Sequence, residues 1–121
     1  MKNESIDGRI KPVRKSVEVK RSPAEAFEIF SGRISSWWPK HKHSVSLERT
    51  LDVVLEPRQG GAIYEVRDDG ERFPWGEVLV WESPYRLVIF WYPGQDPSRG
   101  QELEVRFEAV DGGTRVELEH R

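Results

Sequence analysis

Cysteine is absent from the 121 residues of the chain. Its absence excludes disulfides, thiolate nucleophiles, zinc–thiolate sites and iron–sulfur clusters together. The chain also lacks any apolar run near the roughly 20 residues that a membrane-spanning helix needs. The first residues are polar and contain no apolar core of a secretion signal. We therefore expect a cytoplasmic protein with no membrane partner.

A net charge large enough to attract a polyanion is lacking as well. The 19 Lys and Arg residues nearly balance the 21 Asp and Glu residues, which leaves a formal charge of −2. Such a balance builds no field that would gather nucleic acid, so we expect no nucleic-acid partner. The basic residues between positions 9 and 21 are interleaved with glutamate and apolar residues, which is typical of a solvated strand face.

The apolar residues that are present favour strands. The 13 valines outnumber the 7 leucines, and β-branched residues suit a pleated sheet. Residues 1–12 are polar and aperiodic, which predicts a flexible N-terminal arm. We expect one domain over residues 13–121, since a chain of this length can bury one core without crosslinks. Valine alternating with polar residues over 13–20 predicts its first strand.

A strong local signal follows that strand. Residues 22–25, Ser-Pro-Ala-Glu, place a capping serine before a proline at the first helical position and a glutamate at the third. Phe27 and Phe30 then lie on one side of a short helix, and Gly32 is a stop signal. A second short helical or irregular segment is expected over 34–38.

The remaining sequence predicts six strands, over residues 50–55, 62–66, 73–82, 86–92, 102–109 and 114–120. Short connections favour an antiparallel meander. The predicted class is α+β: a seven-stranded curved antiparallel sheet with two short helices after the first strand. One face of the sheet is apolar, and such helices are too short to cover it alone. It carries Leu87, Ile89, Trp91, Leu103, Val105, Phe107, Val116 and Leu118.

Several segments resemble one bacterial family, in the family's own order. They are Ser-Pro-Ala-Glu-Ala-Phe (22–27), Trp-Trp-Pro (37–39), His-Lys-His-Ser (41–44), Glu-Pro-Arg (56–58), Gly-Gly (60–61), Asp-Gly (69–70), Trp-Gly-Glu-Val (75–78), Ser-Pro-Tyr-Arg-Leu (83–87) and Thr-Arg-Val-Glu-Leu-Glu-His (114–120). Over about residues 13–121 the chain is similar to homologues of the activator of heat-shock-protein-90 ATPase. That family lies within the START-like, or SRPBCC, superfamily of polyketide cyclases, lipid-transfer domains and Bet v 1-like proteins.

The resemblance implies a START-like helix-grip fold, in which a long C-terminal helix lies across the concave sheet and leaves a cavity beneath it. This sequence ends at the last strand, so we expect a domain truncated before its last helix. That helix would need about 15 to 20 residues, or about 25 to 30 Å. If residue 121 is the natural end, we expect a second copy, in a homodimer, or an unusual arrangement to cover the apolar face.

An aromatic and histidine segment is the least generic candidate for a ligand site. Trp37, Trp38, His41 and His43 could line the mouth of a cavity. The alternative is that one tryptophan packs under the sheet edge while the histidines face solvent. The two histidines could share a metal only from an extended strand, and a third protein ligand is not evident. Neither a metal site nor another cofactor is therefore predicted.

The other cavity candidates lie on predicted strands: Tyr64, Trp75, Ile89, Trp91, Phe107 and His120. For the aromatic residues the alternative is the sheet core, which is favoured for Trp91. Simple alternation over 73–82 puts Trp75 and Trp81 on one face and Val78 on the other, but both faces could be buried, so no facing is assigned to this strand. No catalytic residue is predicted, since Glu119 and His120 are neighbours on a strand and point to opposite faces.

Three functions remain open, in order of preference. The first is a non-enzymatic domain that binds a small hydrophobic or amphipathic ligand in a cavity. The second is a chaperone-cofactor-like interaction module with a chaperone partner, which the family resemblance implies by analogy. The third is a cyclase or aromatase-type enzyme that uses pocket aromatics with His41, His43 or His120.

Overall fold

A computed structural model, which describes residues 13–36, 45–93 and 96–120, contains seven strands in one antiparallel sheet. Across the sheet the strands lie in the order β1-β7-β6-β5-β4-β3-β2. Strands β2 to β7 form the predicted meander, while β1 pairs with β7 from the other end of the chain. The predicted sheet is confirmed. The strands are β1 (Val13–Val19), β2 (Thr50–Leu55), β3 (Ala62–Arg67), β4 (Arg72–Glu82), β5 (Arg86–Trp91), β6 (Gln101–Val110) and β7 (Gly113–His120).

The α-helix α1 (Pro23–Phe30) begins where the capping signal predicts. The Ser22 hydroxyl oxygen accepts a hydrogen bond from the Glu25 backbone N–H at 3.2 Å, and the Glu25 carboxylate accepts one from the Ser22 N–H at 3.3 Å. Among the described residues, no helix is long and apolar enough to cross a membrane. Of the second predicted helical segment, 34–38, the described residues form one 3-10 turn. The 3-10 turns are η2 (Ile34–Ser36), η3 (Leu47–Arg49) and η4 (Pro97–Arg99).

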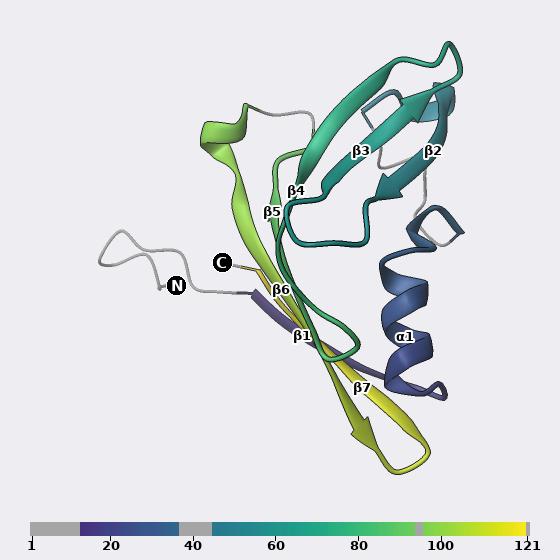
Figure 1. The fold of residues 1–121 in the computed structure, drawn as a ribbon, viewed down its shortest axis with the longest axis vertical. Helices are drawn as coiled ribbons and strands as arrows, with labels where there is room; N and C mark the ends of the chain where they lie inside the picture. Colours follow the sequence, from purple (N-terminus) through teal and green to yellow (C-terminus); the bar gives the residue numbers. More distant parts are fainter. Residues whose placement is uncertain (1–12, 37–44, 94–95, 121) are drawn as a thin grey trace, which may run out of the picture.

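The sheet curves into a half-barrel, and α1 lies on its concave side (Figure 1). Register shifts interrupt the pairing of β2 with β3, of β3 with β4 and of β4 with β5. Such bulges bend a strand and strengthen its twist. Gly76 lies in this region because a Cβ there would collide with the carbonyl oxygen of Phe90 on β5. The helix packs on β6 and β7 and leaves part of the concave side open.

One apolar core joins α1 to the concave face. The Phe27 ring lies 4.9 Å from the ring of Trp81 and 5.0 Å from that of Phe107, measured between centroids. The predicted apolar face of the sheet is confirmed. Leu87, Ile89, Val105 and Phe107 are buried, while Trp91, Leu103, Val116 and Leu118 pack against them partly exposed.

Simple alternation, which left the facing of β4 open, does not hold along this strand. Trp75, Val78 and Trp81 all belong to the same core on the concave side. A register shift within β4 puts Val78 opposite Ile89 and Trp81 opposite Leu87, two residues of the concave face of β5. A bulge adds one residue to a strand, so it reverses the alternation beyond it.

The convex face carries a network of charged residues. Glu104 and Glu119 lie opposite each other on β6 and β7, and both are buried. Arg86 donates a hydrogen bond to Glu104 at 2.7 Å, and Arg106 lies 3.5 Å from each of the two carboxylates. Arg14 on β1 also lies 3.5 Å from Glu119. These cations compensate two carboxylates that would otherwise be buried without a partner.

Candidate functional site

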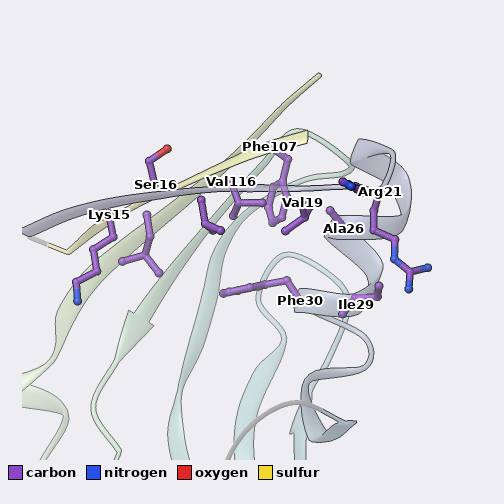
Figure 2. Close-up of a pocket in the computed structure, with 12 residues that line it drawn as sticks. Lys15, Ser16, Val19, Arg21, Ala26, Ile29, Phe30, Phe107 and Val116 are labelled. Atoms are coloured by element: carbon purple, nitrogen blue, oxygen red, sulfur yellow. The ribbon is translucent and has the colours of Figure 1, made fainter. Parts of the chain in front are cut away.

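An apolar groove lies between α1 and the strands β1, β6 and β7 (Figure 2). Its volume of about 930 Å³ is within the range of small-molecule sites. Eight of its lining residues are apolar: Val17, Val19, Ala26, Ile29, Phe30, Phe107, Val116 and Leu118. The other four are Lys15, Ser16, Lys20 and Arg21.

The groove is open because α1 covers only part of the concave face. Val17 on β1 and Phe107 on β6 both lie opposite Val116 of β7, so they share one face of the sheet. Phe107 is 3% exposed, however, whereas Val17 is 56% exposed. The Phe30 ring lies 6.0 Å from that of Phe107 and forms the wall on the helix side. The uncovered apolar surface therefore lies between Phe30 and β1.

A buried carboxylate lies on the concave side at β3. Glu65 is fully buried and accepts hydrogen bonds from the backbone N–H groups of Val45 and Ser46 and from the indole N–H of Trp75, each at 2.7 Å. Burial opposes its ionisation, but the hydrogen bonds from Ser46, Val45 and Trp75 outweigh burial and hold the pKa of Glu65 below its ordinary value. The carboxylate is therefore ionised at neutral pH and holds the backbone of Val45 and Ser46 against the sheet.

His120 ends β7 on the concave face, opposite Leu103 of β6. Its Nε2 atom is buried and has no hydrogen-bond partner among the described residues. Buried polar atoms are nearly always paired, so this nitrogen is a position where a ligand could provide the missing partner. Within the described ranges, no group of three or more histidine or acidic residues could hold a metal ion.

The structure brings some of the predicted site residues together on the concave side. Phe107 lines the groove. Ile89 and Trp75 are buried in the core, and Trp91 is partly buried with its ring centroid 5.5 Å from that of Trp75. Ile89, Trp75 and Trp91 therefore belong to the floor of the concave face and do not line the open groove.

Tyr64 lies apart from that set. It alternates with the concave Glu65 along β3 and so points to the convex side, where the Arg72 guanidinium lies 4.8 Å from its ring. Sequence reasoning did not identify the lining residues of β1 and α1, although the apolar face of each element was recognised. The remaining candidates lie outside the described residues: Trp37, Trp38, His41 and His43.

The curved seven-stranded sheet with α1 on its concave side defines a START-like domain; the described residues contain these parts of the helix-grip fold and not its long C-terminal helix. This fold supports a ligand-binding domain. The sequence profile of the family described as "Activator of Hsp90 ATPase homolog 1-like protein" matches residues 20–121. The chain belongs to this family. A comparison with curated protein sequences finds no match.

Solved structures of similar proteins share the fold. Txn09, an anthrahydroquino-γ-pyrone synthase in complex with SUM, is 38% identical, with 92% of this chain and 76% of that chain covered and a TM-score of 0.65. An uncharacterised protein from Rhizobium leguminosarum is 20% identical, with 91% and 74% covered and a TM-score of 0.69. The Aha1 dimer from Colwellia psychrerythraea is 17% identical, with 93% and 76% covered and a TM-score of 0.67.

Proposed function

We propose that this domain binds a small apolar or amphipathic molecule in the groove between α1 and strands β1, β6 and β7. The observation that carries the proposal is apolar surface left open inside a concave site, with Val17 exposed at 56% of its surface. Each Å² of apolar surface removed from water contributes about 25 cal/mol, so a ligand that fills the groove gains binding energy from surface already in place. Membership of a ligand-binding superfamily supports the same function.

The experiment is a titration with Nile red, a neutral apolar dye, followed by its fluorescence. Val17→Asp places a charge on the floor of the groove, and an apolar ligand cannot compensate a charge that it removes from water. We expect the affinity to fall at least about tenfold. Leu51→Asp is the matched control, because Leu51 is 65% exposed, lies on the other edge strand of the sheet and does not line the groove.

The proposal fails if Nile red shows no saturable binding to the wild-type chain. It also fails if the two aspartate variants lose affinity equally, since the dye would then bind at exposed apolar surface in general rather than in the groove.

A cyclase-type enzyme is the second candidate function. The observation that favours it is the 38% identity with Txn09, a synthase that forms a γ-pyrone by its name. The unpartnered Nε2 of His120 supports this candidate, because a half-buried imidazole with its free nitrogen inside the concave side could transfer a proton. The test is turnover of anthrahydroquinone-type polyketides, monitored by chromatography, with wild-type protein and a His120 variant.

A further inference from the structure

We propose that the ligand of the groove is an amphipathic anion, with an apolar body and one negatively charged group that binds at Lys15. This inference rests on the proposed binding function and adds the chemical class of the ligand. It follows from how the charged side chains are divided between the two faces of the sheet, and from the place of Lys15 along the groove.

On the convex face the cations of β1, β5, β6 and β7 have acidic partners. Arg115 lies 3.1 Å from Glu108 and 3.4 Å from Glu18. The other arginines on this face also lie within 3.5 Å of a glutamate: Arg14, Arg86 and Arg106. The convex side of these strands thus neutralises its own charge and leaves no cation for an added anion.

Lys15 differs from these cations. It lies opposite Leu118 and two residues before Val17, so its side chain leaves β1 on the concave side. Figure 2 shows Lys15 on the same side of β1 as Val19, with Ser16 on the other side. Lys15 forms no ion pair with any described residue. It therefore interrupts an apolar face with an uncompensated charge.

The groove itself contains no acid that could compensate Lys15. None of its 12 lining residues is acidic. The buried carboxylate of the concave side, Glu65, does not line the groove and already accepts three N–H groups of the chain at 2.7 Å. Arg21, at the other end of the groove, pairs with Glu25 at 3.8 Å. An anion in the groove would therefore find a free cation at Lys15 on β1 or at Lys20, just after the strand, and Lys15 is the one that interrupts the apolar face.

The spacing along β1 sets the size of the apolar body. Lys15 and Arg21 lie at opposite ends of the groove in Figure 2, with Val19 between them beside α1. Four residues separate Lys15 from Val19, which is about 13 Å at a rise of about 3.3 Å per residue. Both a medium-chain fatty acid and a polycyclic aromatic acid combine an apolar body of this size with one terminal carboxylate.

Two matched pairs of probes test whether the negative charge of the ligand strengthens binding, and they distinguish a fatty acid from a polycyclic aromatic acid. Dodecanoate is compared with dodecanol, and anthraquinone carboxylate with hydroxymethyl anthraquinone, by displacement of Nile red from the full chain at low ionic strength. We expect the acid of at least one pair to bind about three- to fivefold more tightly than its neutral partner, since one partly exposed ion pair has about that effect. The pair with the tighter acid identifies the source of the ligand.

The variant Lys15→Gln removes the charge and keeps a polar side chain that is only one atom shorter. It should abolish the preference for the acid and leave the affinity for the neutral probe unchanged. Arg99→Gln is the matched control, because Arg99 is an exposed cation that does not line the groove, and its removal changes the net charge equally. Raising the salt concentration should reduce the preference of the wild type but not of Lys15→Gln.

The outcomes separate this inference from the binding function. Saturable binding of acid and neutral probes with equal affinity, and no effect of Lys15→Gln, overturns the anionic class while the groove remains a binding site. If Lys20→Gln abolishes the preference for the acid and Lys15→Gln does not, the assignment of the anion to Lys15 is overturned. Failure of Nile red and all four probes to bind removes the proposed function and this inference with it.

Discussion

Replacing Glu65 by glutamine would remove the charge of a fully buried side chain and keep its shape. In the wild type, N–H groups of Val45 and Trp75 donate to one carboxylate oxygen and the N–H of Ser46 donates to the other, each at 2.7 Å. Glutamine offers one carbonyl oxygen and places an NH₂ group where the second oxygen was. In either orientation of the amide, at least one donor loses its acceptor and faces another donor.

The size of the effect follows from this count. A hydrogen bond to a charged group contributes about 1.5 to 3 kcal/mol, and a buried donor left without an acceptor costs about 1 to 3 kcal/mol. We therefore expect Glu65→Gln to lower the free energy of unfolding by about 2 to 4 kcal/mol at neutral pH. Domains of this kind have a free energy of unfolding of about 5 to 15 kcal/mol, so the variant should fold with a much reduced stability.

The destabilisation should also depend on pH. Burial opposes the ionisation of Glu65, yet the hydrogen bonds from Ser46, Val45 and Trp75 make its pKa lower in the folded chain than in the unfolded one. The stability that comes from the ionised group is fully present above the unfolded pKa, about 4.3, and is lost as the pH falls through the lower folded pKa. The difference between wild type and Glu65→Gln is therefore largest at neutral pH and shrinks in acid.

Urea denaturation followed by circular dichroism, at about pH 7 and about pH 3.5, measures the destabilisation by Glu65→Gln and its dependence on pH. Glu77→Gln is the control, because Glu77 is exposed on β4 and its replacement should change the stability by no more than about 0.5 kcal/mol. Equal effects of the two variants at neutral pH would refute the reasoning. A Glu65→Gln difference of the same size at both pH values would refute its electrostatic part.

Two further predictions concern β4 and β7. Gly76→Ala should destabilise the sheet by about 1 to 3 kcal/mol in the same assay, because the new Cβ collides with the Phe90 carbonyl oxygen, whereas Gly32→Ala, with its nearest atom 3.6 Å away, should have a small effect. Similar stability of the two alanine variants would contradict this geometry. If the domain is a cyclase, His120→Ala should abolish turnover and keep Nile red binding, and loss of both together would argue for a structural role of the imidazole.

Much of the architecture could be predicted because its signals are local. The alternation of Leu103, Val105 and Phe107 with charged residues is contained in one strand, and β6 has that pattern in the structure. The capping box of Ser22 and Glu25 spans four consecutive positions and sets the start of α1. Such patterns need no knowledge of distant residues, so they can be interpreted from the sequence alone.

The facing of β4 could not be predicted in the same way. Alternation assigns Trp75 and Val78 to opposite faces, but both are fully buried on the concave side. The cause is the bulged pairing of β4 with its neighbours, which depends on the partner strands rather than on the sequence of β4. In the sequence of β4, only Gly76 indicates that the backbone of β5 lies unusually close to this strand.

The groove could not be located for a related reason. Val17 and Val116 meet only because the first and last strands pair, and nothing in either segment specifies that pairing. The candidate residues were selected for aromatic or imidazole side chains, and large aromatics such as Trp75 fill the core instead. The lining of the groove is mostly aliphatic. Its side chains differ from the other apolar residues of the sheet only in that no other element covers them, and this depends on the assembled fold.

An uncovered groove also links binding to stability. Val17 lies on an edge strand and is half exposed, so β1 is held by its pairing with β7 more than by burial of its own side chains. A ligand that covers this face supplies the missing apolar contacts and binds only the folded chain, which stabilises it by about 2.7 kcal/mol at a concentration of 100 times Kd. That gain is similar to the loss expected for Glu65→Gln. A true ligand should therefore return the melting temperature of Glu65→Gln close to that of the free wild type, while the same ligand concentration should stabilise Val17→Asp by about half as much or less.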